Sequence, residues 1–357
     1  MKTAGVAGIG TILSPVDSFA TISEQFAQNT DDGLVPKRPF GKTGENVPIL
    51  GLGGMFDIPS NQLLMKQAIK WGVTYWDTAD CYEGGNSEKG IGMYFEKYPE
   101  ERKKIFLVTK SDARDPDGMT SLLYRSLEKM KTSHVDLYFV HGISSIDELD
   151  NKTKTWAEKA KAAKKIRFFG FSTHSNMEEC MMGAARLGWI DGIMMTYNFR
   201  LMHSDRMKKA VEACEKAGIG LTAMKTQGGG QVKISSETEL QMAGRFIKNG
   251  YTDKQARLKA VWENPYIASI CSQMPSINIL MSNASAAMDK TRLSSFDIDL
   301  FRRYAGETTG AYCMGCTRIC ESAVNGAAPV GNLMRCLMYT RNYNEPGWAR
   351  NLFNKIW

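Results

Sequence analysis

The sequence has no long apolar run and no strong excess of charge. The mildly apolar stretch within residues 1–20 is shorter than the roughly 20 apolar residues that a membrane-spanning helix needs, so we expect no stable membrane span. The formal net charge is +7 over 357 residues, and the lysines of 152–165 are spaced as on a solvated helix face, so we expect no nucleic-acid partner. Hydrophobic residues at 43% and charged residues at 23% are typical of a folded globular protein.

The amino-terminal segment lacks the arginine pair that its pattern would suggest. The stretch KTAGVAGIG resembles the middle of a twin-arginine export leader, and Ser18-Phe19-Ala20 is a plausible cleavage site for a signal peptide. We therefore expect residues 1–35 to be an export-leader-like segment and a polar linker, and the protein to be periplasmic. The alternatives are a start upstream of Met1, another export route, an apolar tethered tail, or a disordered amino terminus on a cytoplasmic protein.

Short apolar runs recur along the rest of the chain. They alternate with amphipathic stretches such as 62–71, 121–130 and 206–217 at intervals of roughly 25 to 30 residues, the spacing of one strand, one helix and two loops. Eight such units predict an α/β fold, a (β/α)8 TIM barrel over residues 36–300, with a small cysteine-bearing extension over 305–357. The apolar runs end near residues 53, 77, 110, 141, 172, 197, 225 and 272.

Four polar residues sit at or just past the ends of three of these predicted strands: Asp77, Tyr82, Lys110 and His141. In a parallel barrel the carboxyl ends of the strands open onto one face, where active sites lie. Reduction of a carbonyl by a hydride needs a proton donor, and a phenol can serve if its pKa falls from roughly 10 toward neutrality. A neighbouring ammonium lowers that pKa, and a buried carboxylate keeps the ammonium charged.

The segment Trp76-Asp77-Thr78-Ala79-Asp80-Cys81-Tyr82, followed by Asn86-Ser87-Glu88, resembles the strand-two signature of the aldo-keto reductase family. The resemblance implies that Tyr82 is the general acid or base, that Lys110 and Asp77 tune it, and that His141 orients the substrate. The implied reaction is reduction of a small-molecule carbonyl, or oxidation of an alcohol, with NAD(P). Taken singly, these residues also suit surface ion pairs and a structural histidine.

The same resemblance places the nicotinamide cofactor at the ends of strands five to eight. Met194 stands where the family commonly has glutamine, and neither Arg nor Lys follows strand eight within 272–278, so we expect little preference for NADP over NAD. Any one of these positions could instead be an ordinary polar loop residue. The candidate cofactor-binding residues are Gly53, Ser172, Tyr197, Asn198, Lys225, Ser276 and Asn283.

Eight cysteines divide into two groups. Four are scattered and are expected to be single buried thiols, whereas Cys313, Cys316 and Cys320 form a C-x2-C-x3-C run, with Cys336 following. The run resembles the ferredoxin-tailed branch of aldo-keto reductases, which implies a [4Fe–4S] iron-sulfur cluster and a possible electron-transfer partner. Zinc, disulfides or free thiols remain alternatives. The rival functions are an iron-sulfur electron-transfer protein and a ligand-binding barrel without hydride transfer.

Overall fold

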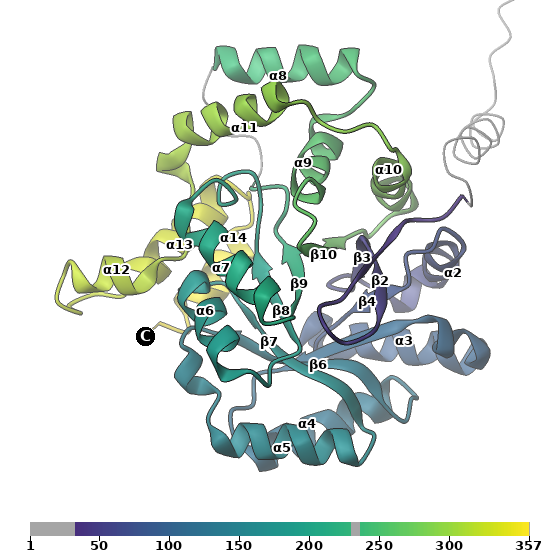
Figure 1. Cartoon of the computed structure of the whole chain (residues 1–357). Helices are drawn as coiled ribbons and strands as arrows, with labels where there is room; N and C mark the ends of the chain where they lie inside the picture. The colour runs from purple at the N-terminus through teal and green to yellow at the C-terminus, as the bar shows by residue number, and fades with distance from the viewer. Residues whose placement is uncertain (1–32, 230–235, 357) are drawn as a thin grey trace, which may run out of the picture.

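Eight parallel strands close into a barrel at the centre of the molecule (Figure 1). The computed structural model describes residues 33–229 and 236–356, so the predicted leader lies outside the described residues. Around the barrel the strands follow one another in chain order, and β10 closes against β3. The predicted (β/α)8 barrel is therefore confirmed. The strands are β3 (Leu50–Gly53), β4 (Tyr75–Asp77), β5 (Phe106–Ser111), β6 (Val135–Ile143), β7 (Ile166–Thr173), β8 (Gly192–Thr196), β9 (Gly220–Met224) and β10 (Ile267–Gln273).

Amphipathic helices cover the outside of the barrel, and many begin at a side chain that accepts a backbone N–H. Three helices, α4, α7 and α10, are capped in this way by Asp115, Ser204 and Ser276. Each capping residue fixes the point at which a loop ends and its helix begins. The helices against the barrel are α2 (Gln62–Lys70), α3 (Asn86–Lys97), α4 (Pro116–Lys129), α5 (Asn151–Ala162), α6 (Met177–Leu187), α7 (Asp205–Lys216), α9 (Asp253–Trp262) and α10 (Ile277–Met288). Helices α8 (Glu237–Lys248) and α11 (Ser295–Glu307) pack on each other and on α9 in a second apolar cluster (Figure 1).

A short hairpin closes the amino-terminal end of the barrel. Strands β1 (Lys37–Pro39) and β2 (Asn46–Pro48) pair antiparallel, and Phe40 in the turn between them is fully buried. Its ring lies against Gly192 and Gly220, the first residues of β8 and β9. A Cβ built on Gly220 would lie 2.5 Å from that ring, so glycine is required for the close approach.

The carboxyl-terminal extension lies over the opposite end of the barrel. It contains α12 (Thr317–Ser322), α13 (Val330–Arg341) and α14 (Pro346–Phe353), drawn in yellow in Figure 1. Arg335 donates to the carbonyl of His174 just past β7, at 2.6 Å, and Lys225 just past β9 donates to the hydroxyl of Tyr339, at 2.5 Å. The extension therefore forms part of the surroundings of any site at the barrel mouth.

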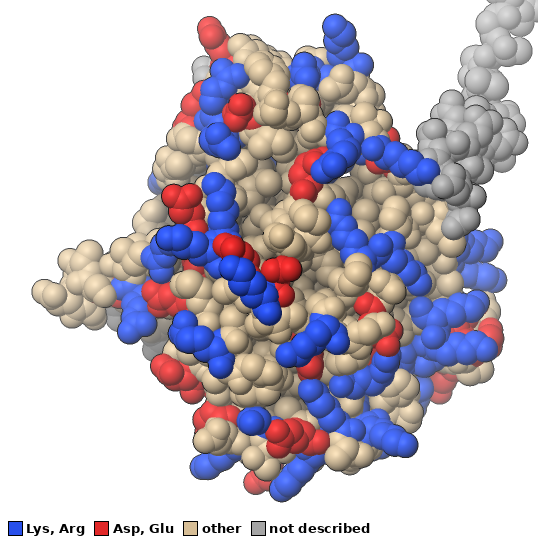
Figure 2. All heavy atoms as spheres, viewed as in Figure 1, with Lys and Arg blue, Asp and Glu red and all other residues tan. Residues whose placement is uncertain are grey.

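On the face seen in Figure 2, Lys and Arg side chains are interspersed with Asp and Glu. Within the described part of the chain, every helix is too short or too polar to cross a membrane.

The hairpin gives a first prediction. Phe40→Ala removes a fully buried ring from the closed end of the barrel, and we expect it to lower the free energy of unfolding by about 3–5 kcal/mol. Leu63→Ala on α2, where the side chain is 81% exposed, is the matched control and should change stability by less than about 0.5 kcal/mol. Urea unfolding measures both. Equal effects of the two substitutions would contradict the conclusion that the buried Phe40 ring stabilises the amino-terminal end of the barrel.

Candidate active site

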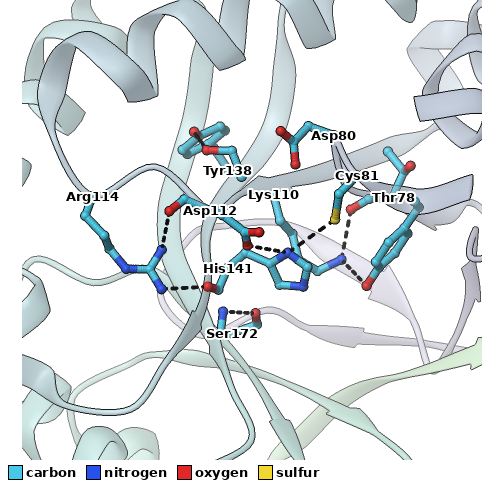
Figure 3. Close-up of polar contacts among 12 residues, drawn as sticks. Thr78, Asp80, Cys81, Lys110, Asp112, Arg114, Tyr138, His141 and Ser172 are labelled. Carbon is cyan, nitrogen blue, oxygen red and sulfur yellow. Dashed lines mark hydrogen bonds and ion pairs between the residues drawn. The ribbon is translucent and has the colours of Figure 1, made fainter. Parts of the chain in front are cut away.

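The four residues predicted to act together do lie together, and Figure 3 labels Lys110 and His141 among them. Asp77 ends β4, Tyr82 begins the 3-10 turn η2 (Tyr82–Gly85) that follows it, Lys110 lies in β5 and His141 in β6. Strands β4, β5 and β6 are neighbours in the barrel, so their carboxyl ends bring these side chains to one place. All four line the same cavity.

Lys110 is the centre of this group. Its side chain is only 1% exposed, and its ammonium lies 2.7 Å from Asp77 Oδ2. It also donates to the Thr78 carbonyl at 2.8 Å and contacts the Tyr82 hydroxyl at 3.3 Å. Burial alone would lower the pKa of Lys110, but the Asp77 carboxylate and Tyr82 outweigh it and raise that pKa above its ordinary value. The lysine is therefore charged at neutral pH.

The pKa of Tyr82 differs from the sequence-based expectation. Burial of the hydroxyl raises it to about 12, although the Lys110 ammonium acts in the lowering direction. The expected fall toward neutrality is not found, because removing water from the phenolate has a larger effect than one cation at 3.3 Å. Tyr82 thus keeps its proton at neutral pH and can donate it.

His141 is held at its ring and at its backbone. The ring stands edge-on to Tyr82, with centroids 5.9 Å apart, and Nδ1 lies 3.2 Å from Asp112 Oδ1. The hydrogen bond from His141 lowers the pKa of Asp112. Arg114 donates to the His141 carbonyl at 2.8 Å. Asp112 had no sequence signal of its own, because it belongs to a loop that only the fold brings next to β6.

Two of the scattered cysteines also reach this region, which corrects the expectation of four buried thiols. Cys81 is exposed, and its sulfur lies 3.9 Å from His141 Nδ1. Cys271 of β10 is partly buried and donates to Asp77 Oδ2 at 3.5 Å. Cys180 and Cys214 are buried as expected.

The cavity that these residues line has a volume of about 1090 Å³ and extends from the tetrad to the start of α10. Its wall includes cationic side chains of α9 and aromatic side chains of the carboxyl-terminal extension, neither of which the sequence had indicated. The additional lining residues are Met55, His174, Met194, Met224, Thr226, Gln227, Gly229, Glu239, Met242, Ala243, Asp253, Lys254, Arg257, Cys271, Ser272, Gln273, Pro275, Ile279, Tyr339, Tyr343, Glu345 and Trp348.

Three of the predicted cofactor-binding residues, Gly53, Ser172 and Lys225, line the cavity. Two more lie just behind its wall. Ser276 caps α10 by accepting from the Ile279 N–H, and the Asn283 amide donates to the hydroxyl of Ser272 at 3.1 Å. These five positions therefore lie around one continuous surface.

Tyr197 and Asn198 lie outside the lining of this cavity, so their predicted role in cofactor binding stays a prediction. Side chains alternate along β8, so Met194 faces the barrel interior and Tyr197 packs in the outer core, where its hydroxyl accepts from Asn264 at 2.9 Å. The Asn198 amide donates to the Lys225 carbonyl at 3.0 Å and to the Tyr312 hydroxyl at 2.9 Å. Neither residue lines the cavity.

The four cysteines of the extension are all partly buried free thiols. The thiols of Cys316 and Cys320 are neighbours, and Cys313 and Cys336 both pack beside the apolar cluster of Met338, Tyr339 and Ala349. In the described residues, no three of these sulfurs lie within 4.8 Å of one another. Since zinc holds thiolates about 3.8 Å apart, they are not arranged as a zinc site. The thiolates around an iron-sulfur cluster lie further apart than this limit, so the spacing does not test the predicted iron-sulfur cluster, which stays a prediction.

The barrel and its tetrad define the class of protein. It is a (β/α)8 barrel whose wall holds a tyrosine, a lysine, an aspartate and a histidine at one mouth, as in an oxidoreductase that needs a proton donor. A model of the Aldo/keto reductase family matches residues 50–263, more than half of the chain. The chain belongs to the aldo/keto reductase family of oxidoreductases.

Known relatives are distant. The chain is 28% identical to the aldo-keto reductase yakc of Schizosaccharomyces pombe, whose name specifies NADP(+), over 55% of this chain and 62% of that protein. It is 30% identical to the oxidoreductase YqkF of Bacillus subtilis over 38% and 48% of the two chains. The chain thus spans less than two thirds of either relative. A solved aldo-keto reductase from Bacillus halodurans shares the fold, with a TM-score of 0.63 and 20% identity over 75% of this chain and 96% of the other.

The contact between Lys225 and the extension gives a pH-dependent prediction. Burial lowers the pKa of Lys225 from 10.5 to about 7, and Arg335 adds to the effect. The unfolded chain then binds more protons than the folded chain between these two values, so this lysine should make stability rise with pH across that window. Lys225→Met should therefore raise stability, relative to the unmodified chain, more at about pH 6 than at about pH 9.

Urea unfolding at the two pH values measures this difference. Lys209→Met, in which an exposed lysine of α7 is replaced, is the control and should give the same small change at both. A Lys225→Met effect that does not vary with pH would show that the lysine is equally charged in the folded and unfolded chains.

Proposed function

We propose that the protein reduces a carbonyl compound, or oxidises the corresponding alcohol, by hydride transfer with a nicotinamide cofactor. One observation carries the proposal: Asp77, Lys110 and Tyr82 form a continuous polar chain, from carboxylate to ammonium at 2.7 Å and from ammonium to phenol at 3.3 Å, that opens into a large cavity. A buried ammonium in contact with a phenol suits a group that must hold a proton and then stabilise the charge that its loss leaves behind.

The surroundings of each of the four residues indicate its role in the proposed reaction. Tyr82 is protonated at neutral pH and donates from its hydroxyl to the oxygen of the substrate as negative charge develops there. Lys110 then stabilises the phenolate, and Asp77 keeps the lysine charged. His141, edge-on to Tyr82 in the same wall, helps to orient the substrate oxygen. In the oxidative direction, the phenolate accepts the proton from the alcohol.

The cavity suits a dinucleotide in its size and in the helix terminus at its far end. Its far end reaches Pro275 and Ile279 at the amino terminus of α10, where backbone N–H groups and the helix dipole favour a phosphate. Lys254 and Arg257 of α9 lie in the cavity wall, where Arg257 is paired with Asp253 at 2.9 Å and Lys254 adds a positive charge. The nicotinamide, when bound, supplies the hydride. Lys254, which precedes strand eight, favours NADP, the cofactor in the name of the S. pombe relative, over the absence of preference expected from residues 272–278.

The extension supports a substrate with an apolar body. Tyr343 and Trp348 line the cavity beside Glu345, and their rings lie 6.5 Å apart. Met224 and Met194 contribute further apolar surface deeper in the barrel. We therefore propose a small carbonyl compound whose carbonyl reaches Tyr82 while its apolar part contacts the side chains of the extension.

A second candidate function is electron transfer through an iron-sulfur centre in the extension. It is favoured by the position of Cys313, which lines a small gap together with Lys225, a residue that also lines the main cavity. An iron-sulfur centre on Cys313, Cys316 and Cys320 would therefore lie next to the proposed reductase site.

The proton donor can be tested directly. Tyr82→Phe removes the hydroxyl and keeps the ring, and we expect it to lower the turnover of carbonyl reduction by about 10²-fold or more. NADPH binding, followed by fluorescence titration, should change little. Tyr124→Phe on α4, at a side chain that is 51% exposed, is the matched control and should keep full activity. Undiminished turnover of the Tyr82→Phe protein would exclude this mechanism.

The iron-sulfur candidate has its own test. Anaerobically purified protein should contain about four iron atoms per chain and absorb visible light, and Cys316→Ser should lose both. Cys336→Ser distinguishes the ligand sets: loss of iron indicates four cysteine ligands, whereas full iron content indicates three. An unmodified protein that is colourless and free of iron after anaerobic purification would exclude the centre and leave the reductase proposal untouched.

A further inference from the structure

Three side chains beside the tetrad offer a sulfur, an oxygen and a nitrogen to one point in space. They are Cys81 just before η2, Asp112 just after β5 and His141 in β6 (Figure 3). Their ligand atoms all lie within 4.8 Å of one another, and among the described residues no other group of His, Cys, Asp or Glu does so. The three lie on neighbouring segments of the barrel mouth, so the fold itself brings them together.

Two of the three spacings between the ligand atoms are close to those around a tetrahedral zinc ion. A zinc ion bound at about 2.0–2.3 Å to each ligand holds nitrogen and oxygen about 3.3 Å apart and nitrogen and sulfur about 3.6 Å apart. Here Asp112 Oδ1 lies 3.2 Å and Cys81 Sγ lies 3.9 Å from His141 Nδ1. A metal could therefore enter with shifts of a few tenths of an ångström in these two distances.

The surroundings favour a divalent cation that accepts sulfur and nitrogen. A thiolate with an imidazole selects zinc or a similar ion over magnesium and calcium, which prefer oxygen ligands. The Asp112 side chain is 61% exposed and Cys81 is exposed, so an ion can reach them from solvent. Arg114 forms its ion pair with Glu148, at 2.8 Å, and acts on the Asp112 carboxylate as a nearby charge, as does Lys355. Arg114 also donates to the backbone carbonyls of Asp112 and His141, at 3.1 and 2.8 Å, and so holds both ligand-bearing segments in place.

We propose that Cys81, Asp112 and His141 bind one Zn²⁺ ion, with a fourth position open to water. The cation replaces the hydrogen bond between His141 Nδ1 and Asp112, and the thiol proton of Cys81 is released to solvent on binding. An imidazole whose Nδ1 carries a metal must keep its proton on Nε2. Zinc occupancy therefore fixes the tautomer of the histidine that the proposed reductase uses, and it links metal availability to that site.

Cobalt titration tests the site without relying on catalysis. Protein stripped with a chelator should bind Co²⁺ and develop the near-ultraviolet absorption of a cobalt–thiolate bond, which added Zn²⁺ should abolish. Cys81→Ser should lose this absorption. Asp112→Asn should keep it but weaken cobalt binding by at least about 10-fold. Persistence of the full absorption in Cys81→Ser would overturn the proposal.

The cysteines of the extension provide the matched control. Cys313→Ser and Cys316→Ser, made separately, should retain the cobalt–thiolate absorption lost in Cys81→Ser, and its loss in either of them would assign the band to the extension instead. The chain has no cysteine or histidine in residues 1–32 or 230–235, so those segments cannot supply the thiolate. Failure of the unmodified protein to bind Co²⁺ or Zn²⁺ in calorimetry would also overturn the proposal. None of these outcomes depends on whether the protein proves to be a reductase.

Discussion

The site depends on one buried ion pair, between Lys110 and Asp77. A lysine that is 1% exposed inside a barrel wall is tolerated only when its charge is paired and hydrogen-bonded, and here a carboxylate and a backbone carbonyl lie within 2.8 Å. The pair spans adjacent strands, so it also fixes how β4 and β5 present their ends. Removing one partner of such a pair leaves an unpaired buried charge. The rest of the site therefore depends on both residues being present.

The proposed chemistry depends on the contact between this ion pair and Tyr82. The cation of the pair touches Tyr82 at 3.3 Å but does not overcome the effect of burial, so the phenol stays protonated at neutral pH. A protonated phenol beside a cation suits the proposed role of acid, because the cation stabilises the phenolate that remains after the proton has left. His141 lies in the same wall, and its ring also forms a hydrogen bond with Asp112, whose side chain is exposed to solvent. Catalysis and metal binding would therefore share one imidazole.

The extension turns an open barrel mouth into a walled cavity. Arg335 and Tyr339 of α13 contact the segments that follow β7 and β9, and Tyr343 and Trp348 complete the wall. The contact with Tyr339 buries the Lys225 amine against a neutral hydroxyl, and this burial lowers the pKa of Lys225 to about 7. The docking of the extension thus comes with a local electrostatic cost that weakens as pH rises.

The sequence by itself determined the barrel and the tetrad. Apolar runs of strand length at regular intervals specify eight parallel strands, and residues at strand ends must meet at one mouth, so Asp77, Tyr82, Lys110 and His141 could be grouped before any coordinates. Local patterns suffice here because each strand end is a local feature and barrel closure then brings the ends together.

Only the tertiary structure decided the remaining features. The alternation of side chains along β8 turned Tyr197 away from the cavity, and burial raised the pKa of Tyr82 rather than lowering it. Contacts between distant segments brought Tyr339 to Lys225 and Asp112 to Cys81. Such contacts depend on how loops and the extension pack in three dimensions, and no spacing along the chain encodes them.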